Sequence, residues 1–293
     1  MKRRNAFLNK NFFSILILFI ISLPVKAQYQ DSITQNKKAI DSTLINEHLD
    51  SLNGLPKTFY TDGYRIRATA LQKLIKVCID FYQSKFSAHQ FNVPLYVLDS
   101  NDWKEQLFAV PYALPDYLPE NNIIIIGAEK NALAKLSGQP QTTTSESIVS
   151  GYDYVAVHEL GHYFFITLNN TRTHQKWFDE FVANYFLVAF MIEKKPDVTI
   201  EWNKMIEDND KDIPEHRTLE DFEKFYDQVG PPNYDWYQKK FMKLCFLLYP
   251  QFKTKLITDI VENYASGGKN IDALTLMKSI ASETMNKWLK EMQ

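Results

Sequence analysis

Hydrophobic residues recur at helical spacing over much of the chain, and only two short stretches have the composition of strands. Apolar positions such as Leu71, Leu74 and Ile75 predict a helix over residues 65–89. Residues 93–98 (VPLYVL) and 123–126 (IIII) predict strands, because branched and aromatic residues dominate them. Loops are expected at 109–120, which has three prolines, and at 137–147. Further helices are predicted at 148–168, 177–193, 219–228, 234–248, 254–264 and 271–292. Strands early and helices late predict an α+β fold.

The N-terminus has the features of an export signal. Four basic residues open it: Lys2, Arg3, Arg4 and Lys10. The apolar run 12–23 that follows is too short to cross about 30 Å of hydrocarbon as a helix. We therefore expect residues 1–27 to be a signal peptide, cleaved after Ala27, and the protein to be periplasmic or extracellular. Residues 28–60 are predicted to be an N-terminal arm or short pro-segment, and 61–293 a single domain.

Composition and charge narrow the class of protein. With 45% apolar and 23% charged residues over 293 positions, the chain is globular rather than disordered. Its formal charge is −2, and loss of the five basic residues in the signal leaves 28 basic against 35 acidic residues, or −7. An acidic exported protein is a poor partner for nucleic acid, and no stable membrane insertion is expected after signal removal. Cys78 and Cys245 lie in apolar helical patterns, so we expect free, buried thiols.

One motif stands out, His158-Glu159-Leu160-Gly161-His162, which matches H-E-x-x-H. Residues four apart on a helix share a face, so His158 and His162 can bind one cation. Imidazole nitrogen suits Zn²⁺, and Glu159, rotated by about 100°, can instead take a proton from water. The alternative is a pair of structural histidines bonded to backbone carbonyls.

A catalytic zinc usually has three protein ligands, so a third must lie elsewhere. Leu168 occupies the position where a longer motif would have another histidine. The best candidate is Glu180, because a carboxylate within the apolar segment WFDEFVANYF needs a partner. Asn184 shares its helical face and could orient a histidine ligand. His174 and Asp179 are the rival ligands.

These two motifs together resemble the gluzincin zinc metallopeptidases, the superfamily of thermolysin-like and aminopeptidase-N-like enzymes. The resemblance implies one Zn²⁺ ion held by His158, His162 and Glu180, with Glu159 as general base. It implies a small N-terminal sheet followed by a mostly helical zincin-type half. It also implies peptide or protein substrates that pair with an edge strand before the motif helix, a position that residues 123–126 occupy in chain order.

The resemblance further implies a tyrosine that donates to the developing oxyanion. Tyr237 fits best, early in the helix predicted at 234–248, and Tyr234 is the alternative. The subfamily stays open, because residues 127–131 (GAEKN) depart from the G-x-M-E-N motif and residues 179–184 from N-E-x-x-S-D. Two other functions stay open: a binding or scaffold protein with a structural zinc, and a zinc hydrolase of non-peptide amides.

Overall fold

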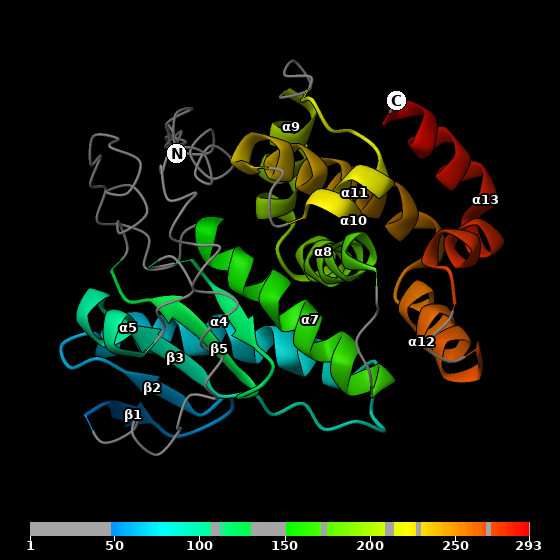
Figure 1. The fold of residues 1–293 in the computed structure, drawn as a ribbon. Helices are drawn as coiled ribbons and strands as arrows, with labels where there is room; N and C mark the ends of the chain where they lie inside the picture. Colours follow the sequence, from blue (N-terminus) through cyan, green and yellow to red (C-terminus); the bar gives the residue numbers. More distant parts are fainter. Residues whose placement is uncertain are drawn as a thin grey trace, which may run out of the picture.

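The computed structural model of the chain describes residues 48–106, 112, 114–129, 151–170, 175–208, 214–226, 230–267 and 271–292. Within these residues the fold is α+β: a small mixed sheet comes first and a mostly helical part follows (Figure 1). The fold class expected from the sequence is confirmed. The predicted signal peptide, residues 1–27, lies outside the described residues, as does most of the predicted arm.

The sheet has five strands in the order β1-β2-β3-β5-β4. They are β1 (Asp50–Leu52), β2 (Thr58–Tyr60), β3 (Leu95–Leu98), β4 (Asp116–Leu118) and β5 (Ile123–Gly127). The three inner strands are parallel, and β1 and β4 run antiparallel at the two edges. Because β1 and β2 belong to the sheet, the domain begins at or before Asp50, earlier than the boundary predicted at residue 61.

The isoleucine strand β5 is an inner strand, and the expectation that it forms the substrate edge is wrong. Its side chains are buried on both faces, with Ile123 the most exposed of the four isoleucines at 4%. A strand covered on both faces belongs in the middle of a sheet, where apolar side chains find partners on either side. The edge next to it is β4, which pairs antiparallel to β5 with Tyr117 opposite Ile124.

Helices cover the sheet unequally. The helices α4 (Arg65–Gln83) and α7 (Val155–Asn169) pack on one face, where they bury the side chains of Leu95, Val97 and Ile124. The short helix α5 (Ser100–Gln106) covers the other face, with Trp103 packed against a small separate cluster. The main hydrophobic core begins between this face of the sheet and the helices α4 and α7, and it continues without a break into the helical part of the fold.

A second helical layer lies beyond α7. The helix α8 (Lys176–Lys194) packs on α7, and α11 (Gly230–Phe252) packs on α8 in turn (Figure 1). The remaining helices flank this pair: α9 (Pro196–Asp208), α10 (Leu219–Phe225), α12 (Lys255–Gly267) and α13 (Ala273–Glu291). Because α8 is sandwiched between α7 and α11, it is buried around most of its circumference, polar residues Glu180 and Asn184 included.

Several elements differ from the sequence expectation. The structure adds β1, β2, β4, α5 and α9. The helix α9 begins with Pro196 and Asp197, two residue types that favour the first turn of a helix. The helix α11 begins at Gly230, four residues before the helix predicted at 234–248, and the Pro231-Pro232 pair lies in its first turn, where proline is tolerated.

A buried ion pair fixes the entry to α7. Arg67 of α4 donates from two guanidinium nitrogens to Asp153, whose side chain is fully buried in the 3₁₀ turn η1 (Gly151–Tyr154). Replacing Arg67 with Met should lower the free energy of unfolding by about 3–5 kcal/mol, because it leaves a buried carboxylate without its cation. Urea unfolding measures this, and Arg67→Met combined with Asp153→Asn should recover part of the loss. A loss below about 1 kcal/mol for the single variant would contradict a structural role for the pair.

Two other expectations concern the membrane and the thiols. Across the part of the chain that the structure describes, no helix combines the length and apolar character that a membrane crossing requires. Cys78 and Cys245 are free and buried, as expected from their apolar helical surroundings.

Candidate metal centre

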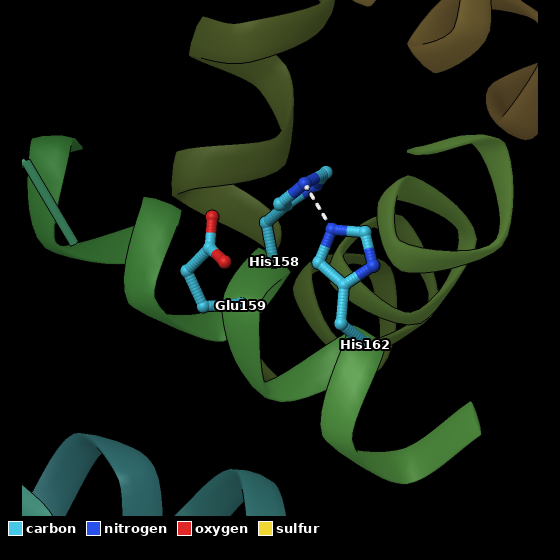
Figure 2. Close-up of side chains that lie close together, drawn as sticks. All are labelled: His158, Glu159 and His162. Atoms are coloured by element: carbon cyan, nitrogen blue, oxygen red, sulfur yellow. Dashed lines mark hydrogen bonds between the residues drawn. The ribbon is translucent and has the colours of Figure 1, made fainter. Parts of the chain in front are cut away.

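The two motif histidines meet nitrogen to nitrogen on α7. The Nε2 atoms of His158 and His162 lie 3.2 Å apart, and the rings are nearly perpendicular (Figure 2). His158 is only 8% exposed, because α8 covers it. Because the two histidines are four residues apart, they lie on one face of α7, as the sequence predicted, and both imidazoles point toward the same place.

Glu180 reaches the same point from α8. Its Oε2 lies 3.2 Å from Nε2 of His158, and the residue is 5% exposed. Glu159 also offers an oxygen within 4.8 Å of both rings. Of these two carboxylates, Glu180 has its oxygen against His158 Nε2, whereas Glu159 Oε2 accepts a hydrogen bond from the Tyr117 N–H at 3.1 Å.

A chain of side-chain amides determines which nitrogen of His158 carries a proton. Gln238 Nε2 donates to Glu180 Oε2 at 2.7 Å, and Asn184 Nδ2 donates to Gln238 Oε1 at 2.7 Å. The Asn184 Oδ1 then lies 3.1 Å from His158 Nδ1. An amide oxygen only accepts, so Nδ1 of His158 is the donor and carries the hydrogen.

This arrangement fits a bound cation. With a hydrogen on Nδ1 directed at Asn184, His158 presents its Nε2 atom to both His162 and Glu180. A hydrogen on Nε2 could form a good hydrogen bond to only one of these two neighbours. A metal ion placed between the two nitrogens and the carboxylate oxygen could bind all three atoms. Ligand atoms around a tetrahedral zinc with bonds of about 2.0–2.1 Å lie about 3.3–3.4 Å apart, close to the 3.2 Å seen here.

The surroundings of Glu180 favour its ionised form. Burial opposes the charge, but the His158 hydrogen bond and the nearby imidazoles outweigh burial and hold the pKa of Glu180 well below its usual range. The Tyr226 hydroxyl adds a further hydrogen bond, donating to Oε1 at 2.6 Å. A carboxylate that keeps its charge in a buried place is suited to binding a cation.

Glu159 lies between α7 and the edge strand β4. Burial raises its pKa well above the usual range, and the negative charges of Asp116 and Glu180 raise it further, while the Tyr117 N–H lowers it. Asp116, next to Tyr117 on β4, has its pKa raised to about 7, mainly by burial. A carboxylate whose proton affinity is raised in this way is suited to general acid–base chemistry.

Tyr237 is not placed at this site, contrary to the sequence prediction. Its hydroxyl donates to the backbone carbonyl of Thr218 at 2.8 Å, and its ring packs against Phe222. The alternative, Tyr234, lies one turn earlier on α11, and its ring lies 6.0 Å from that of Tyr226, whose hydroxyl donates to Glu180. Burial, followed by the charges of Glu180 and Glu159, raises the pKa of Tyr234 well above its usual range, so its hydroxyl stays protonated and able to donate.

Gly161 allows the two ligand-bearing helices to approach each other. A Cβ atom at this position would lie 2.8 Å from the carbonyl oxygen of Ala183 and 3.1 Å from Cβ of Phe186, both on α8. The sequence did not indicate this contact, although the small residue at the second variable position of the motif permits it. The close approach brings Glu180 within reach of His158.

Gly161→Ala should therefore destabilise the protein by about 1–3 kcal/mol, because the added methyl group meets backbone that cannot move aside. Helix propensity alone predicts the opposite sign, a gain of about 1 kcal/mol. Urea unfolding of the variant distinguishes the two. A variant as stable as the parent, or more so, would mean that α7 and α8 do not touch at this point.

Two other residues, Asp179 and His174, were candidates for the third ligand position. Asp179 is on α8 beside Glu180, about 100° further around the helix, and its charge raises the pKa of Tyr264. His174 lies outside the described residues. Tyr226, Gln238 and Asp116 contact the candidate site and were not expected from the sequence.

Comparison of the chain with protein-family models, curated proteins and solved structures finds no match. The likeness to gluzincins accordingly rests on the motif residues.

Proposed function

We propose that this protein is an exported zinc-dependent peptidase. The observation that carries the proposal is the meeting of His158 Nε2 with both His162 Nε2 and Glu180 Oε2 at 3.2 Å. Two imidazoles and a carboxylate, drawn from two packed helices, are a frequent ligand set of catalytic zinc. A bound zinc ion would supply Lewis-acid polarisation of a carbonyl group and a lower pKa for water.

Glu159 is the proposed general base. It is next to the ligand His158 in sequence but turned toward β4, so it can take a proton from the attacking water. The same carboxyl group can then deliver that proton to the leaving amine. Its raised pKa, caused mainly by burial, suits a group that must both accept and release a proton.

Tyr234 is the proposed donor to the oxyanion that develops on the scissile carbonyl. Its side chain is at Glu180 and is close enough to Glu159 for the two charges to raise its pKa. A hydroxyl that keeps its proton can donate a hydrogen bond where negative charge develops during the reaction.

The edge strand β4 is the proposed binding place for the substrate backbone. It ends the sheet, and its Tyr117 N–H points to Glu159 rather than to β5. An extended peptide can add to such an edge by backbone hydrogen bonds, which places its scissile bond beside α7. This favours a peptide or protein as substrate, and the acidic charge of the exported chain argues against nucleic acid.

Metal analysis of the purified mature protein, combined with digestion of a peptide library with and without a zinc chelator, tests the proposal. We expect one zinc per chain and cleavage that the chelator abolishes. Zinc without turnover of any peptide would favour a structural zinc in a binding protein. Zinc with hydrolysis of non-peptide amides alone would favour a zinc hydrolase of non-peptide amides. Absence of zinc from the protein would refute the metal centre.

A further inference from the structure

We propose that Tyr226 is a positioning residue that holds the Glu180 carboxyl group in the orientation required of a zinc ligand. Tyr226 follows directly after α10, and its hydroxyl donates to Glu180 Oε1 at 2.6 Å. The other oxygen of the carboxyl group, Oε2, lies 3.2 Å from His158 Nε2. The inference rests on the proposed zinc site, and it adds a residue at the end of a third helix to the two helices that carry the ligands.

The two oxygens of Glu180 have different neighbours, which defines how the carboxyl group is turned. Oε1 faces the Tyr226 hydroxyl, whereas Oε2 faces His158 and accepts from the Gln238 amide at 2.7 Å. The last torsion of a glutamate side chain has a broad, roughly twofold energy profile, so covalent preference alone does not fix this orientation. Hydrogen bonds from other residues must fix it, and Tyr226 supplies the one to Oε1.

Burial makes the contact with Tyr226 difficult to replace. Glu180 is 5% exposed, so an oxygen that loses its donor has little access to water. A buried acceptor without a partner is unfavourable, and the carboxyl group would turn toward another donor. Such a turn moves Oε2 away from His158, so the loss of one hydroxyl on the Oε1 side would change the ligand position on the Oε2 side.

The helix α10 does not depend on this hydroxyl for its attachment. Glu223 of α10 accepts a hydrogen bond from the Trp177 N–H at the start of α8, at 2.8 Å. Phe222 is fully buried, and its ring packs against that of Tyr237 on α11. Removing the Tyr226 hydroxyl should therefore leave α10 in place, which makes the orientation of the carboxyl group the main contribution of this hydroxyl.

The test is Tyr226→Phe, which removes the hydroxyl and keeps the ring, in the purified mature protein. The measurement is binding of Zn²⁺ by competition with a chelating dye. Loss of the partner that orients a metal ligand typically weakens metal binding by about 10–100-fold, and we expect a loss in that range for Tyr226→Phe. A zinc affinity equal to that of the parent would overturn the inference.

Two control variants remove the same group from tyrosines whose hydroxyls donate elsewhere. Tyr237→Phe deletes a bond that also fastens α10, from the Tyr237 hydroxyl to the Thr218 carbonyl at 2.8 Å. Tyr249→Phe deletes a bond to another glutamate of α8, Glu193, at 2.8 Å. Both controls should bind zinc as the parent does. A loss of affinity in Tyr237→Phe as large as that in Tyr226→Phe would assign the effect to loosening of α10 and reject the positioning role.

A double variant shows whether Tyr226 acts through Glu180. If it does, Tyr226→Phe should weaken zinc binding much less when Glu180 has already been replaced by Ala, because the carboxyl group that the hydroxyl orients is gone. Equal losses in both backgrounds would place the effect of Tyr226 elsewhere and contradict the inference. A Tyr226→Phe protein that keeps its zinc affinity but loses peptide turnover would also contradict it, and would make the hydroxyl a catalytic donor.

The positioning role and the peptidase proposal fail separately. A parent that binds zinc and cleaves peptides, with unchanged zinc affinity in Tyr226→Phe, would reject the positioning role and leave the peptidase proposal standing. A parent that binds zinc but cleaves no peptide, with weakened zinc binding in Tyr226→Phe alone, would do the reverse. A parent that binds no zinc would reject both.

Discussion

Glu159→Gln should abolish peptide hydrolysis and leave zinc bound. Glutamine keeps an oxygen that can accept the Tyr117 N–H, so the local structure should survive. It cannot take a proton from water, however, and general acid–base groups contribute about 10²–10⁴-fold to rates. We expect kcat to fall by about a thousandfold or more, which is the upper part of that range. The measurement uses a peptide substrate identified in the library digest.

Glu262→Gln is the control, because the same chemical change there affects an exposed side chain on α12. It should keep full activity. Glu159→Gln protein that still hydrolyses the peptide at more than about a tenth of the parental rate would show that another group is the base. Loss of zinc in Glu159→Gln would instead indicate that Glu159 is a ligand.

Glu180→Gln should weaken zinc binding by about 10²–10⁴-fold. Structural zinc sites have apparent binding free energies of about 10–16 kcal/mol, and one of three protein ligands accounts for roughly 3–5 kcal/mol of such a total. The amide is similar in shape but lacks the negative charge that lies beside His158 Nε2. Competition with a chelating dye measures the change.

Asp179→Asn is a matched control from the adjacent position of α8. If Glu180 is the ligand, Asp179→Asn should bind zinc as the parent does. The opposite ranking of the two variants would identify Asp179 as the third ligand and remove Glu180 from the proposed site. Equal affinity of both variants with the parent would leave Glu159, or a residue outside the described ranges such as His174, as the third ligand.

The fold class followed from the sequence, but the edge of the sheet did not. The four isoleucines predict a buried strand, since such a run needs cover on both faces. The edge strand β4 has only three residues, between Pro115 and Pro119, and the composition of this stretch of sequence is typical of a loop. Proline is confined to edges because it lacks an N–H, so this pair of prolines was a signal for the edge in a region where loop and strand composition overlap.

The candidate site was predictable where its geometry is local. The spacing of His158 and His162 follows from one helical turn, and Glu180 stands out as an acid among aromatic residues. The contacts of Gln238 and Tyr226 depend on how α11 and the chain after α10 pack on α8, which no local pattern encodes. The choice of Tyr237 over Tyr234 was wrong for the same reason: both lie early in one helix, and only packing decides that the Tyr237 hydroxyl turns to the Thr218 carbonyl, away from the site.

The contact at Gly161 has a consequence for the choice of ion. Because α7 and α8 meet there without an intervening side chain, the separation of the donor atoms is governed by main-chain packing rather than by flexible side chains. Calcium prefers six to eight oxygen ligands at about 2.3–2.6 Å in a flexible geometry. Two imidazoles and one carboxylate held this closely offer too few oxygen atoms and too little space for it. In the proposed zinc site, selectivity against the abundant alkaline-earth ions would then follow from how two helical backbones fit together.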